Sequence, residues 1–211
     1  YPNRPKQVLQ LYEFEACPYC RFVREVITEL DLDVDIFPTP KGGKRFRPEA
    51  EKIAGKEQFP LLVDPNTNTT LLESGAIAAY LHEQYGRGKE PWAVKLMREP
   101  VSSSLASATR QMRGMNMRPS KVVAYQPEQP IELFSFESSP YSRKVRELLC
   151  ELEIPYRLRS TGKVLWREIG PPAVRTKLFP NALVLGPKRQ ELLARGGKLQ
   201  LPYLFDPNTG T

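Results

Sequence analysis

An internal repeat constrains this chain more than any other feature of its sequence. Residues 11–21 match residues 133–143 when the chain is shifted by 122 positions. A second match joins residues 59–67 to residues 201–209 at a shift of 142, which leaves 20 extra residues between the matched stretches of the second copy. Because both stretches recur in the same order, the chain is predicted to contain two copies of one folding unit.

The first copy, copy one, shows strand and helix patterns in turn. Strands are marked by alternating apolar and polar residues, and helices by apolar residues three and four positions apart. Proline suits the first turn of a helix, and Pro18 is predicted to begin the first one. In chain order the patterns predict a strand at 8–14, a helix at 18–30, a strand at 32–36, a helix at 48–54, strands at 61–63 and 70–72, and a helix at 75–85.

The order of these elements, β-α-β-α-β-β-α, is that of the thioredoxin fold. The second copy, copy two, begins in the same way, with a strand at 131–136, a helix at 141–152 and a strand at 156–159. The sequence ends at Thr211, inside the predicted hairpin of copy two, so the closing strand and helix are expected in a longer natural protein. The predicted fold class is therefore α/β, with two thioredoxin-fold units in tandem and the second truncated at its C-terminal end.

The repeat also predicts the domain organisation. Residues 6–86 are predicted to form the first domain, residues 87–129 a basic, methionine-containing linker, and residues 130–211 the incomplete second domain. Two interpretations of the linker stay open. It is either a connecting segment packed on one domain, or a surface for a protein partner or a peripheral membrane contact.

Composition narrows the classes of function. The net charge of +7 is spread along the chain, without a dense basic block beside aromatic residues, so no nucleic-acid partner is predicted. Three cysteines are too few for a secreted disulfide scaffold and favour a reducing intracellular compartment. The chain opens with Tyr1 rather than Met, which is compatible with a processed targeting segment.

The motif CPYC, residues 17–20, lies at the predicted junction of the first strand and the first helix. The unpaired N–H groups and the dipole of a helix N-terminus favour a thiolate at this place. Cys17 is therefore the predicted nucleophile. Cys20, one turn further along the helix, is predicted to resolve a mixed disulfide or to close a bridge to Cys17. Arg21 and Arg24 add positive charge nearby.

The cysteines also allow interpretations other than a redox pair. A Cys-x-x-Cys pair can be half of a zinc site, but no second pair exists and His82, the single histidine, fits an ordinary helix position, so no metal is predicted. An accidental spacing without activity is a further alternative. Cys150 follows two leucines and is predicted to be buried and inert. Copy two has Ser139 and Ser142 where copy one has thiols, so it is predicted to be redox-silent and either structural or partner-binding.

The motif resembles the active site of dithiol glutaredoxins. Phe59-Pro60 resembles their Val-Pro, in which the proline is cis and its neighbour's backbone pairs with the cysteinyl part of glutathione. Glu73-Ser74 resembles the Glu-Ser pair with which glutathione-transferase N-terminal domains bind the γ-glutamyl end. The resemblance implies that Tyr19 and these four residues form a glutathione cradle, with Glu73 on the ammonium group and Ser74 on the carboxylate.

The whole chain is similar to tandem glutaredoxin/transferase-like proteins of plants and algae, described as thioredoxin-family electron carriers of the chloroplast. This resemblance implies a glutathione-dependent thiol–disulfide oxidoreductase, with glutathione as reductant and a protein disulfide as substrate. It also implies a chloroplast location, in the stroma or at the thylakoid, and a cis Pro202 in copy two. The alternative is a non-catalytic assembly or auxiliary factor that docks on a large membrane protein complex.

Overall fold

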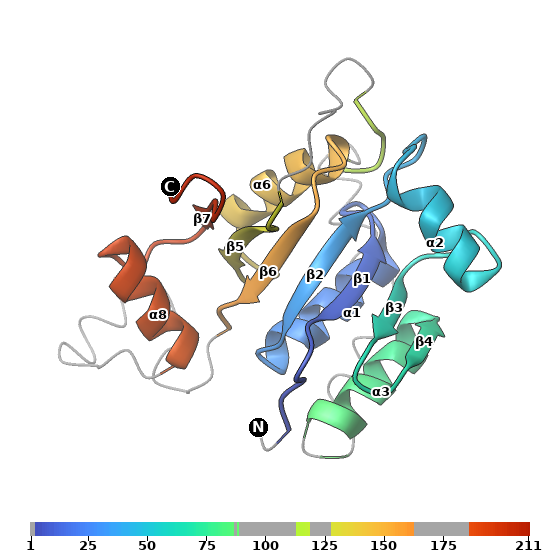
Figure 1. Cartoon of the computed structure of the whole chain (residues 1–211), viewed down its shortest axis with the longest axis horizontal. Coiled ribbons are helices and arrows are strands. Elements are labelled where there is room, and N and C mark those ends of the chain that lie inside the picture. Colours follow the sequence, from blue (N-terminus) through green and yellow to red (C-terminus); the bar gives the residue numbers. More distant parts are fainter. Residues whose placement is uncertain (1–2, 87, 89–112, 119–127, 163–185) are drawn as a thin grey trace.

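A computed structural model describes residues 3–86, 88, 113–118, 128–162 and 186–211 of the chain. Its strands form one mixed sheet of seven, in the order β4-β3-β1-β2-β6-β5-β7. The first four of these come from copy one and the last three from copy two, so a single sheet runs through both units (Figure 1). The chain has the predicted α/β fold, with two thioredoxin-like units in tandem.

Copy one follows the predicted order, and each predicted boundary lies within two residues of the observed one. Its elements are β1 (Leu9–Glu13), α1 (Pro18–Glu29), β2 (Asp33–Pro38), α2 (Phe46–Ala54), β3 (Leu61–Asp64), β4 (Thr69–Leu72) and α3 (Ser74–Tyr85). The turn between β3 and β4 is stabilised by Asp64, whose carboxylate accepts a hydrogen bond from the backbone N–H of Asn66 at 2.7 Å. This aspartate-mediated turn explains why the Asp-Pro-Asn-Thr sequence forms a hairpin.

Copy two contains β5 (Ile131–Ser135), α6 (Pro140–Glu151), β6 (Tyr156–Ser160), α8 (Pro187–Gly196) and β7 (Tyr203–Phe205). Helix α8 was not predicted, although it matches α2 at the larger shift of 142. Strand β6 still matches β2 at the smaller shift of 122, so the 20 extra residues lie between β6 and α8. Most of that segment, residues 163–185, is outside the described residues.

The two copies meet where β2 and β6 pair in antiparallel orientation. In this register Val34 lies opposite Leu158, Asp35 opposite Arg157, and Ile36 opposite Tyr156. Asp35 and Arg157 are equivalent positions of the repeat. Val34 is equivalent to Tyr156 and Ile36 to Leu158, so exchanging the two copies exchanges the two flanking pairs. The pairing therefore has approximate two-fold symmetry about this central pair, which is the geometry of an interface between identical subunits.

One hydrophobic core extends under both copies, on the face of the sheet that carries α1, α3 and α6 (Figure 1). Leu9 and Ile36 of copy one share this core with Leu133 and Leu158 of copy two, and each is at most 3% exposed. Successive strand residues point to opposite faces, so Tyr12 instead packs with residues of α2 on the other face. Burial of the shared core stabilises the contact between the copies in addition to the strand pairing.

Only a short part of the predicted linker, residues 87–129, is described. The backbone N–H of Lys41 donates to the carbonyl of Met115 at 2.6 Å, and the N–H of Arg118 donates to the carbonyl of Glu151 at 2.9 Å, so this part contacts both copies. The rest of the predicted methionine- and arginine-containing surface falls outside the described residues. The domain boundaries stay predictions. Among the helices that the structure describes, none combines the length and apolar character that a membrane span requires.

Candidate thiol site

The CPYC motif lies where β1 feeds into α1, as predicted. Cys17 is the N-cap of α1, with extended backbone angles (φ −71°, ψ 123°), and Pro18 is in the first helical turn. The Cys17 Sγ accepts a hydrogen bond from the backbone N–H of Cys20 at 3.4 Å. A tight turn precedes the helix, because the Cys17 N–H donates to the carbonyl of Phe14 at 3.0 Å. The sulfur is thus directed at the N–H groups of the first helical turn.

The two thiols have opposite electrostatic surroundings. The pKa of Cys17 is lowered to about 7, first by a hydrogen bond from the Cys20 thiol and then by backbone N–H groups and Arg24, against the effect of burial. Burial raises the pKa of Cys20 well above its ordinary value. Cys17 is 4% exposed and Cys20 is fully buried, while Tyr19 between them is 52% exposed. Cys17 is therefore the thiol of this pair that is more readily converted to a thiolate, and the exposed Tyr19 lies at the rim of the thiol site.

The structure joins Phe59 and Pro60 to the redox turn, a name used here for residues Phe14–Cys17. The Phe59–Pro60 peptide is cis. The ring of Phe59 meets the ring of Phe14 edge to face, with centroids 6.2 Å apart. The guanidinium of Arg47, which the sequence did not single out, lies 4.9 Å from the Phe59 ring centroid. A cation beside the cis proline is a further group that an anionic ligand could meet.

Glu73 and Ser74 lie at the N-terminus of α3, close in space to Gln58, the residue before Phe59. Ser74 is the first residue of α3, and Glu73 is its N-cap with a positive φ of 70°. Side chains of this type adopt such a φ rarely, and the strain that it implies is found often at functional sites. The carboxylate of Glu73 accepts a hydrogen bond from the side-chain amide of Gln58, the residue before Phe59. A hydrogen bond thus links Glu73 to the residue that precedes the Phe59–Pro60 pair.

Copy two reproduces the geometry of the thiol site with oxygen in place of sulfur. Ser139 is the N-cap of α6, and its hydroxyl accepts a hydrogen bond from the Ser142 N–H at 3.3 Å. The Ser142 hydroxyl also donates to the Ser139 hydroxyl at 2.9 Å. The Leu201–Pro202 peptide is cis, as the repeat predicted. Because a hydroxyl cannot form a disulfide, this copy retains the geometry of the site without the capacity for disulfide formation.

A buried set of charged residues connects the two sites. We call it the cross-copy network; it consists of Glu13, Glu15, Arg24, Glu137 and Arg146, each at most 7% exposed. Arg24 of copy one donates to the Glu137 carboxylate at 2.9 and 3.3 Å. Arg146 of copy two donates to the Glu15 carboxylate at 3.1 to 3.3 Å. The two ion pairs occupy equivalent positions at a shift of 122, so each copy supplies an arginine to the other.

The surroundings of the network shift the pKa values of its carboxyl groups in opposite directions. Burial raises the pKa of Glu13 to about 8, against the attraction of Arg24 and with further repulsion from Glu15 and Glu137. For Glu137, the attraction of Arg146 and Arg24 overcomes the burial and lowers the pKa. Near neutral pH, Glu13 is thus largely protonated.

The sequence did not reveal this network, because Arg24 was expected only to add positive charge near the motif. The Cys20 thiol has the larger effect on Cys17, and Arg24 is occupied mainly by carboxylates. The signal that could have revealed the network is the recurrence of a glutamate two residues before the motif, Glu15 and Glu137, together with an arginine on each following helix.

The remaining candidate residues have ordinary surroundings. His82 is 2% exposed, and its Nε2 lies 3.9 Å from a carboxylate oxygen of Glu29. Cys150 is 2% exposed, burial raises its pKa, and its sulfur accepts the backbone N–H of Glu15 at 3.5 Å. Within the described ranges, no three His, Cys, Asp or Glu residues form a group that could hold a metal ion.

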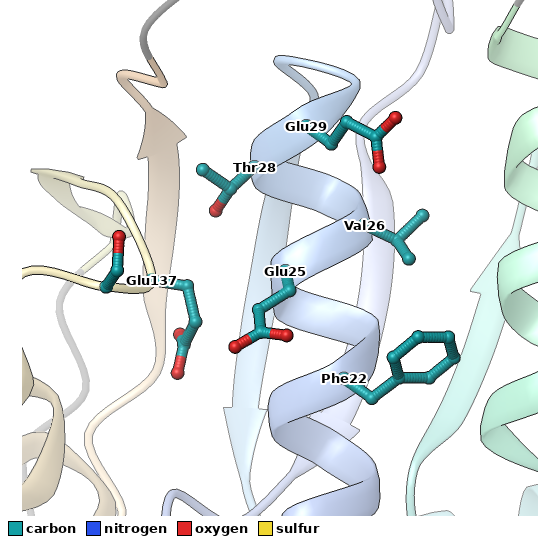
Figure 2. Close-up of a pocket in the computed structure, with 7 residues that line it drawn as sticks. Phe22, Glu25, Val26, Thr28, Glu29 and Glu137 are labelled. Atoms are coloured by element: carbon teal, nitrogen blue, oxygen red, sulfur yellow. The ribbon is translucent and has the colours of Figure 1, made fainter. Parts of the chain in front are cut away.

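A cavity of about 320 Å³ lies along α1, away from the predicted cradle. In Figure 2, Glu25 projects from α1 toward Glu137 of copy two, and Phe22 and Val26 line another side. The full lining is Phe22, Glu25, Val26, Thr28, Glu29, Glu137 and Ser138. None of these lining residues belongs to the predicted glutathione cradle.

Comparison with known proteins identifies both copies. The family model of the glutathione S-transferase N-terminal domain matches residues 11–91 and 133–211. A glutathione S-transferase of Drosophila melanogaster is 34% identical over 85 residues, which are 39% of this chain and 37% of that protein. The chain thus spans well under two thirds of the length of this relative.

Two solved structures give the extent of the structural likeness. A glutathione transferase of Bombyx mori in complex with GTT is 27% identical, with a TM-score of 0.38, over 49% of this chain and 50% of that chain. Glutaredoxin 2 of Salmonella typhimurium in complex with glutathione is 17% identical, with a TM-score of 0.36, over 75% of this chain and 62% of that chain.

Proposed function

Since the chain belongs to the glutathione S-transferase N-terminal domain family, in two copies, we propose that it is a glutathione-dependent thiol–disulfide oxidoreductase with one redox-active copy. The observation that carries the proposal is the state of Cys17. Its sulfur caps a helix and its pKa is lowered to about 7, so that a large fraction is thiolate at neutral pH. Thiolates, not thiols, attack disulfides.

The reaction can be written with the residues at the site. The Cys17 thiolate attacks the glutathione sulfur of a protein–glutathione mixed disulfide, and the protein thiolate leaves and takes a proton. A second glutathione, as its thiolate, then attacks the glutathione sulfur now bonded to Cys17. This step releases oxidised glutathione and restores the Cys17 thiolate. Overall, the protein sulfur gains one electron as it becomes a thiol, and the sulfur of the second glutathione loses one as it enters the new disulfide.

Cys20 offers a second route to the same products. Its thiol is protonated at rest, because burial holds its pKa high. After loss of that proton, Cys20 can attack Cys17, release glutathione as thiolate and close the Cys17–Cys20 disulfide, which two further glutathione molecules reduce. This route explains why the chain keeps both cysteines.

The glutathione cradle is assigned to the residues named from the resemblance. Glu73 accepts the γ-glutamyl ammonium, while Ser74 and the N-terminus of α3 bind the adjacent carboxylate. The backbone beside cis Pro60 pairs with the cysteinyl part, and Tyr19 lines the rim. Chloroplast location stays a prediction from the resemblance.

Activity of single-cysteine variants tests the proposal. The full chain should reduce a glutathione mixed disulfide of a small thiol in an assay coupled to glutathione reductase, and Cys17→Ser should lose this activity. Cys20→Ser should retain it, because glutathione alone can resolve the mixed disulfide. Ser142→Ala, at the position of copy two that is equivalent to Cys20, serves as the matched control, since it lies outside the thiol site. Full activity in Cys17→Ser would contradict the proposal.

A second candidate function is a non-catalytic assembly factor for a membrane protein complex. The preserved geometry of Ser139 and Ser142 favours it, because a site kept in shape without thiols is suited to docking rather than to redox chemistry. Co-purification with a large complex that is unchanged in a Cys17→Ser/Cys20→Ser variant would support this candidate, and its loss in that variant would exclude it.

A further inference from the structure

The redox turn of copy one is held by groups from copy two. Glu15, which is 1% exposed, lies inside this turn two residues before Cys17. Its carboxylate receives the guanidinium of Arg146, with Nε at 3.2 and 3.3 Å and Nη2 at 3.1 Å. Its backbone N–H donates to the Cys150 sulfur at 3.5 Å. Both the side chain and the backbone of one turn residue are thus fixed by helix α6.

These contacts act on the atoms that define the thiol site. The turn is closed by the Cys17 N–H on the Phe14 carbonyl, with Glu15 between these residues. The Cys17 sulfur reaches the Cys20 N–H only while Cys17 keeps its extended N-cap conformation. A rotation of the turn at Glu15 would displace the sulfur from the helix N-terminus, where its negative charge is stabilised.

The anchoring is built into helix α6 rather than formed by a stray surface contact. Arg146 is 1% exposed, and its guanidinium also donates to the Ser135 hydroxyl at 3.0 Å and to the Glu137 carbonyl at 3.2 Å. The Cys150 sulfur in turn donates to the Gly114 carbonyl at 3.3 Å. Buried guanidinium groups with several fixed acceptors are held in one orientation, so they can transmit that orientation to Glu15.

We infer that copy two is a positioning device for the thiol of copy one, with Arg146 as the positioning residue that fixes the redox turn through Glu15. The inference rests on the proposed function, since it assigns a role to the redox-silent copy in the chemistry of Cys17. It adds a role in the thiol site to the prediction that copy two is structural or partner-binding. It also gives Cys150 a role as a hydrogen-bond acceptor.

The test removes the Arg146–Glu15 pair without leaving a buried charge alone. In the full chain, Glu15→Gln/Arg146→Met is compared with Asp35→Asn/Arg157→Gln, which removes another arginine–carboxylate pair between the copies but lies at the β2–β6 pairing rather than at the turn. Two quantities are measured: hydrogen exchange of the amides in residues 11–20, and the rate of Cys17 alkylation by iodoacetamide against pH, followed by mass spectrometry of the peptide that contains Cys17 so that Cys150 stays unaltered.

The first variant should lose exchange protection in the turn, and the midpoint of its alkylation curve should rise by about one pH unit toward that of a free thiol. The control variant should keep both values. Unchanged values in the first variant, or equal changes in the control, would overturn the inference. Arg146→Lys keeps the charge but not the planar fork; it should shift the midpoint in the same direction, and it decides the matter if the double variant does not fold.

The design separates this inference from the proposed function. If the unaltered chain shows the midpoint of an ordinary thiol and no reductase activity, the proposed function fails. If the unaltered chain has a midpoint near 7 and the Arg146 variants share it, only the positioning role fails. The exchange measurement reports on the turn in either case.

Discussion

Asp35 and Arg157 occupy the same position in the two copies, and they lie opposite each other on β2 and β6 with a two-bond ion pair between them. The distances are 2.8 and 3.0 Å. Their side chains are 21% and 29% exposed, so water screens the pair in part. The pair therefore marks the symmetry axis of the sheet, while the shared core supplies most of the stability.

A double-mutant cycle should confirm this modest contribution. Asp35→Asn and Arg157→Gln should each destabilise the chain by less than about 1 kcal/mol, and the coupling energy should be about 0.5 to 1 kcal/mol, as for other partly exposed ion pairs. Urea unfolding of the two single variants and the double variant measures it. A coupling above about 2 kcal/mol would show that this pair, not the core, holds the copies together.

Loss of Arg24 should be far more damaging. Arg24 is fully buried and ion-pairs with Glu15 of its own copy and with Glu137 of copy two, so Arg24→Met removes a positive charge from a buried group of acids. We expect a loss of about 3 to 5 kcal/mol of unfolding free energy. Adding Glu137→Gln should recover part of it, because one buried negative charge is removed. Urea unfolding is the measurement, and a larger loss in the double variant would contradict the assigned pairing.

The raised pKa of Glu13 predicts a specific pH dependence of stability. Between the ordinary value of 4.5 and about 8, the folded chain holds a proton that the unfolded chain has released. The stability from Glu13 is therefore complete below pH 4.5 and is lost as the pH rises through about 8. Unfolding free energy measured from pH 5 to 8.5 should fall less steeply in Glu13→Gln than in the unaltered chain. Parallel curves would show that Glu13 does not titrate in this range.

The Cys20 thiol is the first cause of the lowered pKa of Cys17, so its removal should weaken the nucleophile. In Cys20→Ala the midpoint of Cys17 alkylation should move from about 7 toward the ~8.5 of a free thiol. Cys20→Ser retains a hydrogen-bond donor and should keep a lower midpoint than the alanine variant. Equal midpoints in the two variants would assign the effect to backbone N–H groups alone.

The sequence predicted the elements of copy one and the first three elements of copy two because their signals are local. Pro18 begins α1, the alternation of β1 is regular, and the turn at Asp64 is specified by four adjacent residues. The thiol site followed for the same reason, since a strand that leads into a helix places Cys17 at the helix N-terminus. The cis proline and the Glu73 position followed from family resemblance.

The contact between the copies was not predictable in the same way. The alternating aspartates of β2 are typical of an edge strand that faces water, and their partners lie far along the chain, on β6 (Arg157 and Arg159) and α8 (Lys188). Arg24 and Arg146 had the spacing of surface charges on a helix, yet both are buried. Their burial depends on partners more than 100 residues away, which no local pattern reports.

The continuous sheet has a consequence for the order in which the chain is made. Strand β2 is synthesised long before β6. The edge of β2 therefore stays unpaired until β6 is made, while copy one can already fold. Unpaired edges invite aggregation, and charged side chains are a common protection. Asp33 and Asp35 place such charges on β2, and the same carboxylates later bind Arg159 and Arg157. The carboxylates that protect the nascent strand against aggregation therefore also bind the strand that finally pairs with it.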